Sequence, residues 1–118
     1  MWVRDIKGGI MQVKAIQIEE VTIFLVDGEI NISTSPDLRK LFEKQAAKKV
    51  VVNLEKVIYI DSSGLATLVE MLKKMKSQGG SLGLSGMSAK VKSLFEITKL
   101  DKLFSIFPSQ EEAVTRVK

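Results

Sequence analysis

The chain has 118 residues, of which 45% are apolar and 27% charged, a composition typical of one folded, water-soluble domain. It contains no cysteine and no histidine, which removes disulfides, thiolate zinc sites and imidazole metal ligands. Its 18 basic residues exceed its 14 acidic residues and give a net charge of +4. The basic residues are scattered and no basic-aromatic module accompanies them, so we expect a solvated surface without direct nucleic-acid binding. Alternatively, the basic residues form a patch that binds an acidic partner.

Apolar stretches in this chain are too short to cross a membrane, since none approaches 18 residues. The first five residues also lack the long apolar core of a signal peptide. We therefore expect no membrane insertion and a cytoplasmic location.

The chain begins with residues 1–10, which are interpreted as an N-terminal extension ahead of a domain at 11–118. Trp2, Val3 and Ile6 are suited to an added strand, but Gly8 and Gly9 would uncouple that strand, and Met11 is an alternative start. Next come two β-rich runs on either side of Glu19 and Glu20, which predict an antiparallel hairpin. These runs are Met11–Ile18 and Val21–Val26.

A first helix is predicted after Ser35, with Pro36 at its first position and Ser35 as its N-cap. Its apolar stripe runs from Leu38 to Ala46. The positive charges of Lys48 and Lys49, which follow, would interact favourably with the dipole at the end of the helix. The run Val50–Leu54 is almost continuously apolar, which is typical of a central strand covered on both faces.

A second helix is predicted from Ser62 or Ser63 to Ser77, ended by Gly79 and Gly80. Later elements are a short strand at Leu82–Leu84, a third helix capped by Ser88, a last strand at Leu103–Phe107 and a final helix capped by Ser109. Strands that alternate with amphipathic helices after a hairpin indicate an α/β fold with a mixed sheet. The core positions predicted in the second helix are Leu65, Leu68, Val69, Leu72 and Met75.

The most informative segment is Tyr59–Leu68, in which Asp61, Ser62, Ser63 and Gly64 join an apolar strand to an amphipathic helix. Such turns are where α/β proteins place ligands and modifiable groups. The segment does not fit a hydrolase nucleophile, because the glycine two residues before the serine is missing and the chain has no histidine to act as a base. The usual phosphate-binding and dinucleotide-binding glycine motifs are also missing.

An ordinary helix N-cap is the simplest interpretation of Asp61–Ser63, because aspartate and serine are preferred caps. Two details favour a more specific role. None of the three residues has a Glu or Gln three positions later, and Gly64 stands where the helix begins. A glycine there would leave the neighbouring hydroxyls and N–H groups open to a docking enzyme or a phosphate.

One motif resembles the phosphorylation-site signature of the STAS domain in bacterial anti-sigma factor antagonists. The motif is Asp61-Ser62-Ser63-Gly64-Leu65, which follows Val57–Ile60 and precedes a long amphipathic helix. The resemblance covers about residues 11–118, and the motif is its most specific part. Further matching segments are Gly28-Glu29-Ile30, Val50–Leu54, Gly79-Gly80, Val91 and Leu94-Phe95.

The resemblance implies a binding module that is not an enzyme and needs no cofactor. Its unmodified form would bind an anti-sigma factor that is also a serine kinase, and so release a sigma factor. Phosphorylation at Ser62 would end this binding, and a serine/threonine phosphatase would restore it. The expected partner-binding residues are Asp61, Ser62, Ser63, Gly64, Thr67, Glu70, Glu29 and Asn31, with Thr67 and Glu70 included because they lie off the apolar stripe.

Asn31 is a departure from the family pattern, in which an acid is common at this position. Asparagine keeps a hydrogen-bonding group but loses a charge, which bears on partner choice and on phosphorylation.

Two other interpretations of the same fold are a stress-signalling scaffold and a subunit of a lipid transporter, in which the serine need not be phosphorylated. Nucleotide binding or hydrolysis is weaker, because neither a phosphate loop nor a catalytic base is visible.

Overall fold

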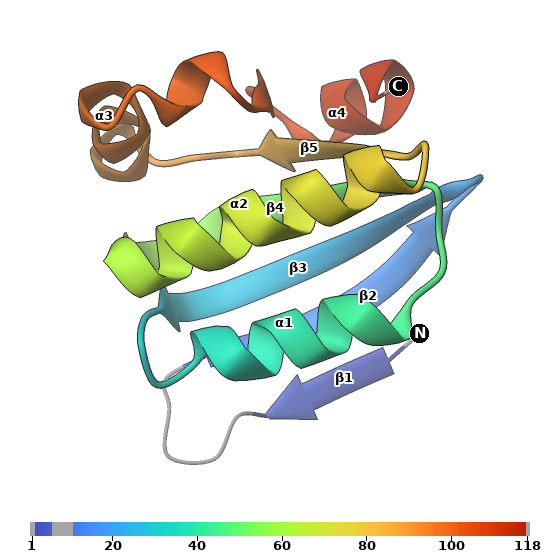
Figure 1. The fold of residues 1–118 in the computed structure, drawn as a ribbon, viewed down its shortest axis with the longest axis horizontal. Helices are drawn as coiled ribbons and strands as arrows, with labels where there is room; N and C mark the ends of the chain where they lie inside the picture. The colour runs from blue at the N-terminus through green and yellow to red at the C-terminus, as the bar shows by residue number, and fades with distance from the viewer. Residues whose placement is uncertain (1, 6–10, 118) are drawn as a thin grey trace.

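In the computed structural model, residues 2–5 and 11–117 are described, residues 2–5 by their backbone only. Six strands form one mixed sheet in which the spatial order of the strands follows the chain (Figure 1). The first three strands pair antiparallel and the last four pair parallel. The strands are β1 (Trp2–Asp5), β2 (Met11–Ile18), β3 (Val21–Ile30), β4 (Lys49–Ile60), β5 (Ser81–Ser85) and β6 (Ser105–Phe107).

The helices lie on both faces of this sheet. Helices α1 (Ser35–Lys44) and α2 (Ser62–Ser77) run side by side across one face (Figure 1). Helix α3 (Ala89–Ile97) adds Val91 and Phe95 to the same core. Helix α4 (Gln110–Arg116) packs Ala113 against the opposite face. Among the described residues, no helix is long and apolar enough to cross a membrane.

The alternation of side chains along β4 explains the two-sided core. Val50 and Val52 belong to the large cluster beneath α1 and α2, whereas Val51 belongs to the smaller cluster beneath α4. All three valines are fully buried, as expected for a strand that pairs with β3 on one side and β5 on the other. The prediction of a central strand at Val50–Leu54 is therefore confirmed.

Most predicted elements are confirmed, and β3, β4 and β5 are longer than expected. The hairpin is present, and β3 continues beyond Val26 to Ile30. Helix α2 has the predicted bounds, and Gly79 follows it with the positive φ of 75° that favours glycine at a helix end. Ser88 and Ser109 cap α3 and α4 by accepting from Val91 N and Glu112 N.

The first helix is shorter than predicted and has a different cap. It ends at Lys44, because Gln45 is already extended and Lys49 pairs with β3 as the first residue of β4. Lys48 and Lys49 thus lie outside the helix. Thr34 rather than Ser35 precedes the helix, and Ser35 is its first residue.

The last strand is shorter than the predicted range Leu103–Phe107. Only Ser105–Phe107 is extended, because Leu103 N donates to Leu100 O and closes the short 3₁₀ turn η1 (Leu100–Lys102). In α2, Val69 is only partly buried, whereas Met71 is part of the core.

The segment ahead of Met11 includes a strand in the described residues. Trp2–Asp5 forms β1 and pairs antiparallel with β2, with Trp2 opposite Ala15 and Asp5 opposite Gln12. This agrees with the added-strand alternative. Ile6, Gly8 and Gly9 lie outside the described residues, and the division into 1–10 and 11–118 stays a prediction.

Candidate functional site

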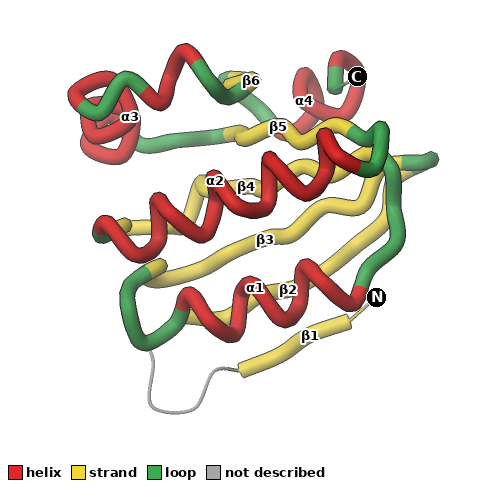
Figure 2. The backbone as a smooth tube through the Cα atoms, in the orientation of Figure 1, coloured by secondary structure: helices red, strands yellow, loops and turns green. Residues whose placement is uncertain are grey.

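The predicted site lies at one edge of the sheet, where the parallel strands β3 and β4 both end. Asp61 alone separates the end of β4 from the start of α2. Its backbone N–H donates to the Ile30 carbonyl at 3.1 Å and so joins the ends of the two strands. The loop from β3 to α1 therefore lies beside the start of α2 (Figure 2). This is the edge at which α/β sheets place functional groups.

Asp61 is a helix cap that also holds the neighbouring loop. Its Oδ1 accepts from Gly64 N at 2.9 Å, and its Oδ2 accepts from Ile32 N at 2.9 Å. The first bond satisfies a free N–H group of the first helical turn, as N-caps do. The second bond crosses to the loop that follows β3. The capping interpretation of Asp61 is thus confirmed, and its carboxylate fixes the geometry of the turn.

Gly64 has a different role from the one expected of it. It was expected among the partner-binding residues and as a gap that leaves the neighbouring hydroxyls open, but it is itself buried. A Cβ atom at this position would meet the Ile30 carbonyl oxygen and would lie 2.8 Å from Ile60 Cγ2. The glycine is needed because α2 starts in close contact with the ends of β3 and β4.

Ser62 and Ser63 differ in exposure. Ser62 is exposed at the first position of α2, whereas Ser63 is half-buried at the second. Among the residues that the structure describes, none forms a hydrogen bond with the Ser62 side chain. The N–H groups of these first positions have no acceptor within the helix. The Ser62 hydroxyl is therefore accessible and lies next to backbone donors.

Asn31 builds the loop beside the serines. Its Oδ1 accepts from Ser33 N at 2.9 Å and Thr34 N at 3.1 Å, and its Nδ2 donates to Glu29 Oε1 at 3.1 Å. A carboxylate at position 31 could accept the same two N–H bonds but would place a like charge against Glu29. Both Asn31 and Glu29 are half-buried. The neutral asparagine thus binds the Glu29 carboxylate without charge repulsion.

The prediction that Thr67 lies on an exposed face of α2 is wrong. Thr67 is fully buried, because α2 packs against α1 as well as against the sheet, and its Oγ1 is 3.4 Å from Arg39 Nη2 of α1. Glu70 is exposed as expected, and its Oε1 lies 3.3 Å from the same nitrogen of Arg39. The structure thus brings Ser62, Ser63, Asn31 and Glu29 to one edge and leaves Thr67 inside.

Several exposed apolar side chains near Ser62 were not among the predicted site residues. Ile58 and Tyr59 are 63% and 45% exposed near the end of β4, which extends beyond the part paired with β5. Ile97 is 79% exposed at the end of α3, and Ile32 is 71% exposed in the loop after β3. The sequence signal that could have indicated these exposed apolar side chains is Ile32, an isoleucine within the polar segment Asn31–Thr34. Ile58, Tyr59 and Ile97 line one groove that also includes Ser62.

The described residues contain no group of three or more acidic, histidine or cysteine residues that could hold a metal ion.

Comparison with known proteins identifies the family. The STAS domain model matches residues 12–113. The anti-sigma-B factor antagonist of Bacillus subtilis is 37% identical over 93 residues, which cover 75% of this chain and 84% of the relative. A crystal structure from Thermotoga maritima, of a protein assigned to the anti-sigma factor antagonists, has a TM-score of 0.84 at 28% identity and covers 89% of this chain and 93% of its own.

The fold is also shared with SpoIIAA of Bacillus. Its phosphorylated form has a TM-score of 0.69 at 18% identity, covering 88% of this chain and 97% of SpoIIAA. Its unphosphorylated form, described as an anti-sigma factor antagonist, has a TM-score of 0.66 at 17% identity, covering 88% and 96%. The relatives described as antagonists are named for a regulatory role and not for an enzymatic reaction. With the family model matched over most of its length, the chain belongs to the STAS domain family.

Proposed function

We propose that this protein is an anti-sigma factor antagonist of the bacterial cytoplasm whose binding is switched by phosphorylation of Ser62. The unmodified form binds an anti-sigma factor that is also a serine kinase, and the sigma factor is released. The same kinase phosphorylates Ser62 and ends the interaction, and a serine/threonine phosphatase restores it. The observation that carries the proposal is the exposed Ser62 hydroxyl at the first position of α2, next to the cap formed by Asp61.

The location of Ser62 suits a modification that leaves the fold intact. A phosphoserine adds a charge of about −1.5 to −2, and the start of a helix stabilises a nearby anion. Ser62 is exposed and not part of the core, so a phosphate on it needs no repacking. Asp61 is the adjacent negative charge, but its two oxygens are each held by a backbone N–H group.

The same phosphate is costly at a protein interface. Burying an ion without a matching partner costs several kcal/mol, and about 1.4 kcal/mol corresponds to a tenfold change in affinity. The exposed apolar side chains around Ser62 suit an interface that excludes water. One phosphate at Ser62 is therefore sufficient to end binding without unfolding the domain.

The names of the relatives support this proposal. The Bacillus subtilis relative is named as an antagonist of anti-sigma-B factor and covers most of this chain. SpoIIAA has the same fold and has been solved in phosphorylated and unphosphorylated forms. The motif Asp61–Gly64, at the start of α2, is the element of this chain that suits such a modification.

A release assay tests the proposal directly. A complex of the source organism's anti-sigma factor with its fluorescently labelled sigma factor is titrated with the unmodified protein, and sigma release is followed by fluorescence anisotropy. We expect release near stoichiometric amounts, and no release by the Ser62→Asp variant. Complete retention of the sigma factor at excess unmodified protein would contradict the antagonist function.

A further inference from the structure

We propose that the groove between α2 and α3 anchors an apolar side chain of the anti-sigma factor, and that an acidic residue beside that side chain meets Lys90. This inference rests on the proposed function and adds the chemistry by which the partner is recognised. The α2–α3 groove has a volume of about 510 Å³. The lining residues that carry the argument are Ile58, Asp61, Ser62, Leu65, Lys90 and Ile97.

Two aliphatic side chains in the walls of the groove are mostly exposed to solvent. Ile97 of α3 and Ile58 of β4 are 79% and 63% exposed, while Leu65 lines the groove from the start of α2 and is itself buried. Single exposed apolar residues are common, but several that converge on one hollow mark an interaction site. A partner that inserts one aliphatic or aromatic side chain would remove this surface from water.

The groove is formed by elements that are already fixed in place. Val91 and Phe95 bury one side of α3 in the core, and the Phe95 ring meets the Phe104 ring edge-on, with a centroid distance of 5.7 Å. Ser88 caps the start of this helix. On the other side, Asp61 holds the start of α2. A site with rigid walls requires little ordering when a partner binds.

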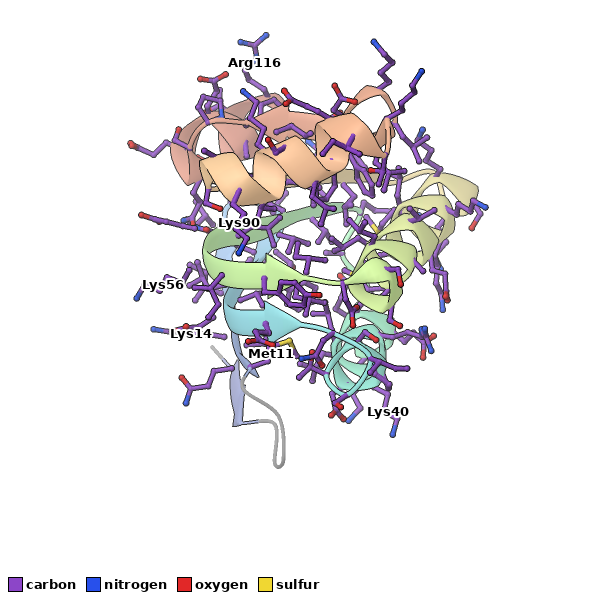
Figure 3. All side chains as sticks on the ribbon, turned by 90° about the vertical axis from the view of Figure 1, so that its left-hand side faces the viewer. Met11, Lys14, Lys40, Lys56, Lys90 and Arg116 are labelled. Carbon is purple, nitrogen blue, oxygen red and sulfur yellow. The ribbon has the colours of Figure 1, made fainter. Side chains whose placement is uncertain are left out.

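The charge in the groove indicates the chemistry of the partner. Lys90 lines the groove and projects from α3 toward the end of β4 (Figure 3). Within the part of the chain that the structure describes, Lys90 forms no ion pair. The Asp61 carboxylate, also in the lining, is held by two backbone N–H groups. Of these two charged groups, Lys90 is the one with no hydrogen bond or ion pair among the described residues, and it favours a carboxylate on the partner.

The groove is continuous with the proposed switch, because Ser62 is part of its lining. An occupant of the groove thus lies against the Ser62 hydroxyl. Phosphate at this position would repel the partner's carboxylate and would compete for Lys90. The switch and the anchor then act on the same surface, which explains how one modification affects the whole interface.

Calorimetric titration with the purified anti-sigma factor of the source organism tests the groove. We expect Ile97→Ser and Ile58→Ser each to reduce affinity about tenfold or more, since central apolar anchors dominate binding. Lys90→Glu should weaken binding similarly, and Lys90→Arg should restore most of it. Leu103→Ser is the matched control, because Leu103 is 43% exposed but does not line the groove. Circular dichroism melts check that each variant is folded.

The outcomes separate the groove from the proposed function. If the wild-type protein binds and the two isoleucine variants and Lys90→Glu bind equally well, the groove proposal is wrong while the antagonist function stands. If the wild-type protein does not bind, both are wrong. Self-association of the wild-type protein that disappears in Ile97→Ser, with unchanged partner affinity, would assign the groove to a second copy of this chain and would also overturn the proposal.

Discussion

Asp61 and Ser62 are adjacent in the chain but serve different purposes. The Asp61 carboxylate accepts two backbone N–H bonds, one from α2 and one from the loop after β3. Ser62 is exposed, and none of the described residues forms a hydrogen bond with its side chain. Because Asp61 is fixed and Ser62 is accessible, the proposed kinase would reach the Ser62 hydroxyl without opening the fold.

Phosphate is expected on Ser62 and not on Ser63. Ser62 is exposed, whereas Ser63 is half-buried at the second position of the helix. The protein is incubated with the partner kinase and ATP, and the site is mapped by fragmentation mass spectrometry. The Ser63→Ala variant is the control and should be phosphorylated normally. Phosphate on Ser63 with Ser62 unmodified would overturn the assignment.

Asp61→Ala is expected to lower the free energy of unfolding by about 1 kcal/mol, within the range of about 0.5–2 kcal/mol for a lost N-cap. The cause is the loss of the acceptor for Gly64 N, together with that for Ile32 N. Asp61→Asn, which keeps one carbonyl acceptor, should lose less. Denaturant melts measure both variants. Equal stability of Asp61→Ala and the wild-type protein would show that the cap is not significant.

At the scale of elements, α2 has two buried sides instead of one. Leu68 and Leu72 belong to the core beneath the sheet-facing side, and Thr67 approaches Arg39 of α1. A helix that contacts both a sheet and a parallel neighbour buries a wider stripe than its apolar residues alone predict. This is why Thr67, a polar residue off the apolar stripe, was wrongly expected at the surface.

Leu68→Ala and Leu72→Ala are each expected to lower the free energy of unfolding by about 2–5 kcal/mol, because both side chains are buried. Glu70→Ala should change it by less than about 1 kcal/mol, because its ion pair with Arg39 is exposed. Urea melts of the three variants provide the comparison. Nearly neutral leucine variants beside a strongly destabilised Glu70→Ala would mean that the orientation of α2 is wrong.

The order and type of the elements could be predicted from local patterns, because hairpin, strand and cap signals lie within a few residues of each other. The hairpin at β2 and β3 and the caps Ser88 and Ser109 are examples. The role of Gly64 could not be predicted in this way. Its cause is the approach of Ile30, which is distant in sequence and is brought near only by parallel pairing of β3 with β4.

The site was predicted better than its surroundings. Ser62 and Asp61 stand out because the motif is contiguous, whereas the α2–α3 groove combines residues of β4, α2 and α3. Ile97 had no distinguishing sequence signal, since an isoleucine at the end of an amphipathic helix is most often buried. It is the last residue of α3 and is exposed, whereas Val91 and Phe95 are the residues through which α3 is buried.

For the whole molecule, the parallel arrangement of the later strands is what brings the site together. The ends of β3 and β4 place the loop at Asn31–Thr34 and the start of α2 side by side (Figure 2). Residues of α3 add the second wall of the groove. The remaining surface of α2, with Glu70 and the lysines near its end, lies along the helix away from this edge. The molecule therefore presents one contiguous surface around Ser62.

The most direct test of the account compares the affinity of four forms for the anti-sigma factor by calorimetry: unmodified, phosphorylated, Ser62→Ala and Ser62→Asp. We predict that the unmodified form and Ser62→Ala bind with similar affinity. The phosphorylated form and Ser62→Asp should bind about a hundredfold more weakly or worse, because an unpaired charge is buried at the interface. All four forms should melt at similar temperatures. Equal affinity of the phosphorylated and unmodified forms would contradict the proposed switch.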